Sequence, residues 1–255
     1  MGRCSELSQT AALLKLLRGW LRAGVFEGGI RSAIEAGTPQ GSPISPLLAN
    51  VALHVLDEAW ATEGRRLGVL VRYADDLVVL CATREQAHAA RELAAAVLDT
   101  LGLRLHPDKT GIAHLARGAA GFTFLGFHHR MRESWKRPGR WYLHKWPAPR
   151  AMASIKAKIR ERTPRTIAHL PLERTVENLN PVLRGWGAYF RYGNSARKFA
   201  TIDAYVNQRL AILASTKHGL RGWNRTTRFT HGWVTSLGVY RLTGTVRPTT
   251  AYASR

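Results

Sequence analysis

The chain has 255 residues, of which 45% are hydrophobic, and a formal net charge of +21. Its length and apolar content allow a substantial core, which excludes a wholly disordered chain and predicts one or two domains. Because no run of about 18 apolar residues and no signal-peptide pattern occurs, we expect no membrane span and no secretion, and therefore a cytoplasmic protein.

The positive charge is concentrated in the second half of the chain. Residues 1–128 contain 13 Lys and Arg against 12 Asp and Glu, whereas residues 129–255 contain 25 against 5, together with 15 of the 22 aromatic residues. Cations that neutralise phosphates and rings that stack on unpaired bases favour a nucleic-acid partner. A helical domain with a basic solvated face, or one that binds an anionic membrane, is the alternative.

The hydrophobic pattern predicts a mixed α/β first half. Its predicted elements are an amphipathic helix from Leu13 to Gly24, a helix from the N-cap Ser45 to about Trp60, a hairpin over 69–83, a helix over 84–102, and short strands over 103–115 and 122–130. Thr83 and Gln86 have the spacing of a capping box for the helix that follows.

The second half is predicted to be a helical domain that follows a basic linker. The linker covers residues 128–146 and marks the shift in composition. Helices are expected over 150–162, 172–193 and 195–219, with Pro181 kinking or dividing the middle one. The predicted domains are therefore 1–127 and 147–217, followed by a basic C-terminal segment over 218–255.

Two adjacent carboxylates, Asp75 and Asp76, interrupt the apolar hairpin VRYADDLVVL. Burying two uncompensated like charges is unfavourable, so a positive group is expected beside them. Paired aspartates can share divalent metal ions, and their hard oxygen atoms suit Mg²⁺. Because such pairs also occur in ordinary turns, the pair alone does not decide the function.

The order of several motifs resembles a known family. YADD, which follows GTPQGSPISPLLANV and precedes LGLRLHPDKT and FTFLGF, is similar to the palm segments of group II intron reverse transcriptases, also called maturases. The segments LNPVLRGWGAYFRYGNSARKF, DAYVNQRL and GVYRLTGTVR resemble the thumb and maturase region of bacterial members. The resemblance covers about Leu13 to Arg247. It implies an α+β fold, in which a partial right-hand polymerase palm (a small antiparallel sheet with helices) precedes an α-helical thumb/maturase domain.

The resemblance also implies a function and roles for particular residues. The family binds intron RNA, assists its splicing and copies it into DNA during retrohoming as an RNA-directed DNA polymerase. Asp75 and Asp76 would bind Mg²⁺ and be catalytic together with Lys109. The expected nucleotide- and template-binding residues are Gly37, Pro39, Gln40, Gly41, Tyr73 and Ala74. The expected RNA-binding residues are Arg150, Lys156, Arg160, Arg184, Trp186, Tyr189, Arg191, Tyr192, Arg197 and Lys198.

The expected partners are structured intron RNA, an RNA template with a DNA primer, and dNTPs. Several of the implied site residues also have plain structural interpretations. The loop around Gln40 also fits a Pro-Gly turn, Lys109 a surface lysine, and Trp186 and Tyr189 a helical core.

The sequence departs from the family at its beginning. Members carry an upstream fingers region and a palm strand of Phe-Asp type with the first metal-binding aspartate, but no aspartate precedes Asp57 here. We therefore expect an N-terminally truncated chain with an incomplete two-metal site, which polymerises only if another polypeptide supplies the missing N-terminal part. The alternatives are a non-catalytic RNA-binding maturase fragment that serves as a splicing cofactor, and an inactive remnant.

Overall fold

The computed structural model describes residues 11–12, 14–19, 25–27, 30–32, 44–219 and 229–247. The chain divides into two compact units, Met1–Ile112 and Ala113–Arg255. The first unit contains 12 Lys and Arg against 12 Asp and Glu, and the second 26 against 5. The second unit therefore carries the entire net charge. Among the described residues, no helix is long and apolar enough to cross a membrane.

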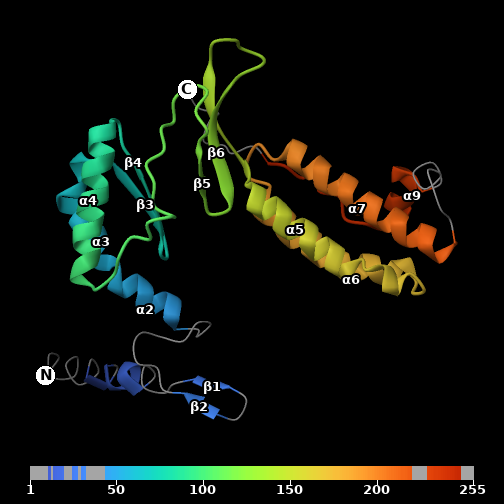
Figure 1. Ribbon diagram of the computed structural model, residues 1–255, viewed down its shortest axis with the longest axis horizontal. Helices are drawn as coiled ribbons and strands as arrows, with labels where there is room; N and C mark the ends of the chain where they lie inside the picture. Colours follow the sequence, from blue (N-terminus) through green and yellow to red (C-terminus); the bar gives the residue numbers. More distant parts are fainter. Residues whose placement is uncertain are drawn as a thin grey trace, which may run out of the picture. The chain divides into compact units, whose positions relative to one another are not determined.

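The first unit combines helices with two small antiparallel sheets. Its elements are β1 (Val25–Glu27), β2 (Ile30–Ser32), α2 (Ser45–Ala52), α3 (His54–Thr62), the 3-10 helix η1 (Gly64–Arg66), β3 (Val69–Tyr73), β4 (Asp76–Leu80) and α4 (Arg84–Thr100) (Figure 1). β1 pairs with β2, and β3 with β4. Of the helix predicted from Leu13 to Gly24, residues 14–19 are described and are helical.

The hairpin of β3 and β4 packs one face against helices. Leu70, Leu77 and Val79 contact a core formed by Leu56 and Trp60 of α3 and by buried alanines of α4. Because successive side chains of a strand point to opposite faces, the alternate residues of β3 face the other way and are exposed. This packing fixes the register of the hairpin, and with it the position of its turn.

The ends of α4 follow from local sequence signals. Thr83 Oγ1 accepts a hydrogen bond from the Gln86 amide (3.2 Å), and Gln86 Oε1 accepts one from the Thr83 amide (3.2 Å), which confirms the predicted capping box. At the other end Gly102 has φ +68°, and the Leu103 amide donates to the Leu98 carbonyl (2.9 Å). This is a Schellman motif, which glycine favours because it has no Cβ.

Two elements of the first unit differ from the prediction. The helix expected from Ser45 to Trp60 is divided at Leu53, whose ψ of −3° departs from the regular helical value and which caps both the end of α2 and the start of α3. Ile44, rather than Ser45, is the N-cap of α2. Residues 103–115 contain no strand, so that prediction is wrong. The His106 carbonyl accepts from the Lys109 and Thr110 amides and forms a tight turn, and no neighbouring strand provides a ladder.

The second unit places a three-stranded antiparallel sheet before a helical bundle. Its elements are β5 (Phe122–Phe124), β6 (Phe127–Glu133), β7 (Trp141–Pro147), α5 (Pro149–Arg162), the 3-10 helix η2 (Arg165–Ile167), α6 (Leu172–Phe190), α7 (Ala196–Lys217) and α9 (His231–Ser236) (Figure 1). The segment 128–146, predicted to be a linker, therefore lies in the hairpin of β6 and β7. Since these strands pair with β5, the two units divide after residue 112 and not after 127.

The helices of the second unit share one hydrophobic core. Its most deeply buried residues are Ile155, Ile159, Leu179, Leu183, Phe199, Ile202, Val206, Leu210, Leu213 and Leu242. Most recur three or four positions apart on their helix, as an amphipathic helix requires. Leu242 and Val234 show that residues 229–247 pack into the same core. Pro181 does not divide α6, which runs as one helix from Leu172 to Phe190.

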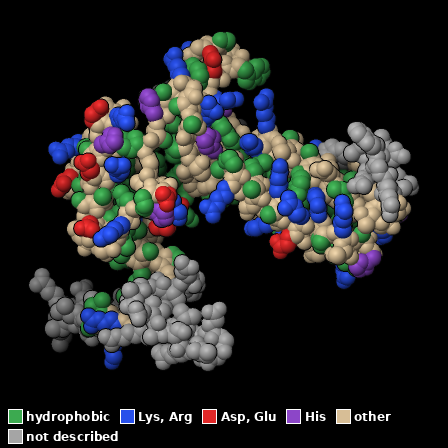
Figure 2. Space-filling model, in the orientation of Figure 1, with side chains coloured by type: hydrophobic (Ala, Val, Ile, Leu, Met, Phe, Trp, Pro, Cys, Tyr) green, Lys and Arg blue, Asp and Glu red, His purple; other side chains and the backbone are tan. Residues whose placement is uncertain are grey.

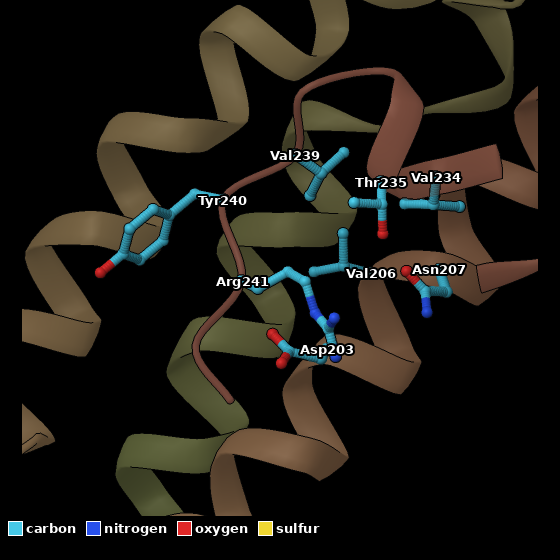
Figure 3. Close-up of a pocket in the computed structure, with 8 residues that line it drawn as sticks. All are labelled: Asp203, Val206, Asn207, Val234, Thr235, Val239, Tyr240 and Arg241. Atoms are coloured by element: carbon cyan, nitrogen blue, oxygen red, sulfur yellow. The ribbon is translucent and has the colours of Figure 1, made fainter. Parts of the chain in front are cut away.

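Polar side chains of α6 and α7 attach the segment 238–243 to the helices. Asn180 of α6 donates to the Gly238 carbonyl (2.9 Å) and accepts from the Tyr240 amide (2.7 Å). Asp203 of α7 accepts from the amides of Leu242 (3.0 Å) and Thr243 (2.8 Å). The seam between α7, α9 and this segment encloses a cavity of about 10 Å³ (Figure 3), which has room for no more than one water molecule.

Candidate nucleic-acid interface

The aspartate pair lies at the tip of the hairpin of β3 and β4. Tyr73 pairs with Asp76, so Ala74 and Asp75 form a two-residue turn. Ala74 has φ +52°, in the left-handed region, which costs a residue with a Cβ about 1–2 kcal/mol. Both carboxylates are exposed, as is the Tyr73 ring. The apolar strands thus present the two carboxylates to solvent on a tight turn.

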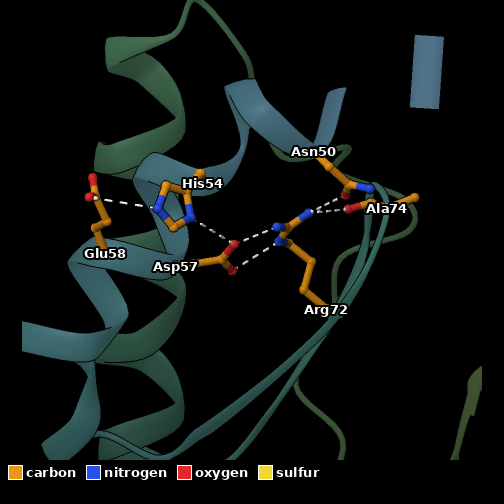
Figure 4. A network of polar contacts seen from close by, with 6 residues as sticks. All are labelled: Asn50, His54, Asp57, Glu58, Arg72 and Ala74. Carbon is orange, nitrogen blue, oxygen red and sulfur yellow. Dashed lines mark hydrogen bonds and ion pairs between the residues drawn. The ribbon is translucent and has the colours of Figure 1, made fainter. Parts of the chain in front are cut away.

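A largely buried arginine side chain, that of Arg72, ties this turn to α3. The Arg72 side chain is 13% exposed, and its guanidinium donates from Nε to Asp57 Oδ1 (3.0 Å) and from Nη2 to Asp57 Oδ2 (Figure 4). Its Nη1 donates to Asn50 Oδ1 (2.9 Å) and to the Ala74 carbonyl (3.0 Å). The hydrogen bonds from Arg72 lower the pKa of Asp57, and those to Asp57 raise the pKa of Arg72. The cation nearest in sequence to the aspartate pair is therefore committed to Asp57.

The residues at the turn supply part of a ligand set for a divalent ion. The oxygen atoms of Asp75 and Asp76 are hard donors of the kind that such ions prefer. Within the described part of the chain, however, no group of three or more His, Cys, Asp or Glu is placed to hold a metal. A site for two metal ions needs more protein ligands than two adjacent carboxylates. We therefore assign no catalytic step to a metal at this turn.

Beyond the turn itself, the other residues expected at a polymerase site are Lys109 and the loop around Gln40. Lys109 is exposed in the turn that begins at His106, and no hydrogen bond or ion pair joins it to Asp75 or Asp76 in the described structure. The loop residues expected to line the template and nucleotide pocket lie outside the described residues; they are Gly37, Pro39, Gln40 and Gly41.

Most of the residues expected to bind RNA lie on the surface of the helical bundle. The exposed members are Arg150, Arg160, Arg184, Tyr189, Tyr192 and Arg197, and the half-buried ones are Lys156, Trp186, Arg191 and Lys198. Figure 2 shows Lys and Arg side chains spread over these helices with few acidic neighbours. The single ion pair among the described residues of this unit joins Arg162 to Glu161 (3.7 Å).

Cation–aromatic pairs order part of this surface. The Arg184 guanidinium lies over the Tyr240 ring (5.4 Å to the centroid), and that of Arg191 over Tyr192 (5.3 Å). The Arg247 amide donates to the Arg191 carbonyl (2.9 Å), which brings a further cation to the end of α6. We call these five residues the α6 cluster. Its guanidinium groups can bind phosphates while its rings offer faces to bases.

The sequence interpretation missed two members of the α6 cluster, Tyr240 and Arg247. Both lie in GVYRLTGTVR, which resembles the maturase region, but they approach α6 only through contacts across more than 50 residues of chain. Their aromatic and basic character was the signal available. Their position beside α6 depends on the anchors provided by Asn180 and Asp203.

Two of the expected RNA contacts have structural partners. Trp186 packs against Phe190 (4.8 Å between ring centroids) and Phe199 (5.5 Å) and so belongs to the core. The Tyr189 hydroxyl donates to the Leu125 carbonyl (2.9 Å) in the turn between β5 and β6. Leu125 has φ +48°, so this hydrogen bond holds a strained turn against α6.

Comparison with known proteins assigns both units. Residues 4–129 match the family described as reverse transcriptase (RNA-dependent DNA polymerase), and residues 152–233 match the group II intron maturase-specific domain. Protein YkfC of Escherichia coli strain K12 is 34% identical over 153 residues, which cover 48% of this chain and 39% of that protein. The chain thus spans about two fifths of the curated relative that it matches. With both domains present in this order, the chain belongs to the family of group II intron reverse transcriptases and maturases.

Proposed function

We propose that this chain acts in group II intron splicing and mobility. The second unit binds structured intron RNA and assists its splicing, and the first unit forms the palm part of an RNA-directed DNA polymerase that copies the RNA into DNA. The observation that carries the proposal is the placement of the whole net charge on the unit that contains the maturase-specific domain.

The charges of the second unit favour binding of a polyanion. Three of its five acidic residues already have partners. Asp203 is buried and accepts hydrogen bonds from backbone amides, Glu133 accepts from the Gly139 amide (2.6 Å), and Glu161 pairs with Arg162. Most of its 26 cations therefore have no acidic partner among the described residues. Each cation that neutralises a phosphate releases a counterion, which gives affinity together with a strong dependence on salt.

The palm assignment gives the aspartate turn its role in this proposal. Mg²⁺ is the ion that we propose for Asp75 and Asp76, with Tyr73 and Ala74 beside the template and Lys109 near the triphosphate. Because two carboxylates are an incomplete set, polymerisation needs a further carboxylate, which we expect from a complementing polypeptide. The primer, the template and the dNTPs would be substrates of that assembly.

A salt-dependent mobility shift tests RNA binding. The probe is a folded group II intron RNA, and the matched variants are Arg160→Gln/Arg184→Gln in the bundle and Arg65→Gln/Arg66→Gln in η1, all at exposed positions. We expect the bundle variant to weaken binding roughly tenfold and to reduce the slope of log Kd against log salt by about two, one for each lost phosphate contact.

The η1 variant, which loses the same charge from the first unit, should bind like the unmodified chain. The proposal is overturned if the intron RNA gives no shift, if the shift is insensitive to salt, or if both double variants lose affinity equally.

A further inference from the structure

The loop that joins β6 to β7 has a composition unlike that of the rest of the surface. This hairpin tip, residues 134–140, reads SWKRPGR. The Trp135 side chain is 84% exposed, more than any other large hydrophobic residue among those described. The reverse transcriptase match ends at residue 129, and the maturase-domain match begins at residue 152, so neither match covers the tip.

The tip has a defined backbone. Pro138 and Gly139 occupy the central positions of a type II β-turn, in which the Arg140 amide donates to the Arg137 carbonyl (3.1 Å). Gly139 has φ +82°, the value that this turn requires at its third residue and that glycine adopts without strain. The sequence RPGR therefore fixes the turn that carries the two arginines.

Side-chain hydrogen bonds close the tip further. Ser134 Oγ accepts from the Arg137 amide (3.2 Å), and the Ser134 amide donates to the Arg140 carbonyl (2.8 Å). The Glu133 carboxylate accepts from the Gly139 amide (2.6 Å). The one acidic residue of the hairpin is thus engaged with backbone. Trp135 is exposed on an ordered loop, which reduces the entropy lost when a ligand binds.

The charges of the tip point to an anionic partner. Lys136, Arg137 and Arg140 are all exposed, and no ion pair involves them among the described residues. Lys136 Nζ lies 5.2 Å from the centroid of the Trp135 ring. A ring with a cation over one face and solvent around the rest can stack on an unpaired base while the cation binds the adjoining phosphate.

We propose that the hairpin tip is a second RNA-binding site, which stacks Trp135 on an unpaired base and holds the flanking phosphates with Lys136, Arg137 and Arg140. An anionic membrane would also attract these cations. RNA is favoured because Trp135 is the one large hydrophobic residue of the tip, whereas a membrane-inserted surface needs several, and because the chain belongs to a family that acts on intron RNA.

The tip is separate from the α6 cluster. It lies at the end of β6 and β7 away from α5 (Figure 1), whereas α6 contacts the turn at the other end of β6 through Tyr189. The seven residues of β6 span about 20 Å at the usual rise of a strand. The proposed site can therefore fail or succeed independently of the function proposed for the helical bundle.

Binding of short RNAs to the full chain tests the tip. The probes are a 12-nucleotide single-stranded oligouridine and a blunt 12-base-pair RNA duplex. We expect Trp135→Ala to weaken binding of the single strand about tenfold and to leave duplex binding unchanged, because only the single strand offers a base for stacking. Trp135→Phe, which keeps a ring, should retain most of the affinity.

Two controls make the result specific. Val69→Ala removes an apolar side chain that is 64% exposed in the first unit and should change the binding of neither RNA. Photocrosslinking with 5-bromouridine RNA should label a peptide that contains Trp135, as identified by mass spectrometry. Because Trp135 packs against no core residue, its variants should unfold at the same temperature as the unmodified chain.

Three outcomes would overturn the proposal. The first is an affinity of Trp135→Ala for the single strand within twofold of that of the unmodified chain. The second is crosslinking confined to segments other than the tip. The third is a Trp135→Ala variant that no longer sediments with phosphatidylserine vesicles but still binds RNA like the unmodified chain. If the folded intron RNA does not bind while the single strand binds through Trp135, the function proposed for the bundle fails and the tip site stands.

Discussion

At the scale of single residues, Arg72 shows how a local sequence signal can mislead. Its position beside the aspartate pair suggests charge compensation within the hairpin, but its guanidinium binds Asp57, 15 residues earlier in the chain. The same contact gives Asp57 a structural role, as the partner of Arg72. The hairpin could be predicted because it follows from a short pattern, whereas the exposure of its two carboxylates and the Arg72–Asp57 pair depend on how the hairpin packs against α3.

Replacing Arg72 should loosen both the hairpin and its turn. Arg72→Ala removes hydrogen bonds to Asp57, Asn50 and the Ala74 carbonyl, and we expect it to destabilise the first unit by about 2 kcal/mol, a value kept low because Asp57 is partly exposed. Urea unfolding followed by circular dichroism measures the loss. Arg66→Ala, an exposed arginine in η1, is the control, and an equal effect of both variants would contradict the assignment.

The incomplete ligand set predicts the behaviour of the aspartates in catalysis. The isolated chain, given Mg²⁺, dNTPs and an RNA template annealed to a DNA primer, should extend the primer no more than its Asp75→Ala variant, because two carboxylates do not complete a two-metal site. An active reverse transcriptase on the same template is the control. Robust extension that Asp75→Ala abolishes would show that this chain completes the site with groups other than those described.

At the scale of elements, local capping signals were more reliable than composition. Thr83, Gln86 and Gly102 fixed both ends of α4, and helices in the second half follow from apolar spacing. The predicted strand over 122–130 covers β5 and the start of β6, but the end of β6 and all of β7 were missed because their basic residues were interpreted as a linker. Charge does not oppose a strand, and aromatic residues favour one. The break at Leu53 carries no Pro or Gly, so nothing in the sequence marked it.

The sheet of the second unit should make stability depend on pH. Burial lowers the pKa of His129, and the positive charge of Lys145 lowers it further. Burial likewise lowers the pKa of His144, together with the positive charge of Arg132. The unfolded chain therefore binds protons below about pH 6.5 that the folded sheet does not, and stability is lost as the pH falls. Urea unfolding at pH 7.5 and 5.5 should show a drop that is smaller in His129→Gln/His144→Gln.

The matched control for this drop is His114→Gln, an exposed histidine of the same unit. That variant should keep the full difference between the two pH values. If the double variant keeps it as well, the half-buried histidines of the sheet are not its cause.

At the scale of the whole molecule, the two units differ in charge more than in any other property. The first unit is neutral, and the second carries the net charge of +21. Composition alone located this asymmetry, since counting charged residues needs no fold. It could not show which cations remain without acidic partners or how Tyr240 and Arg247 come to lie beside α6, because these follow from contacts distant in sequence.

The asymmetry predicts where RNA protects the chain. Hydrogen exchange with folded intron RNA should slow in α5 to α7 and in residues 239–247, because a ligand that binds the native bundle stabilises it against opening, and should remain unchanged in α4. Raising the salt concentration should reverse the protection, since the contacts are to phosphates. Protection that is equal in α4 and in the helical bundle would mean that RNA binding does not follow the charge.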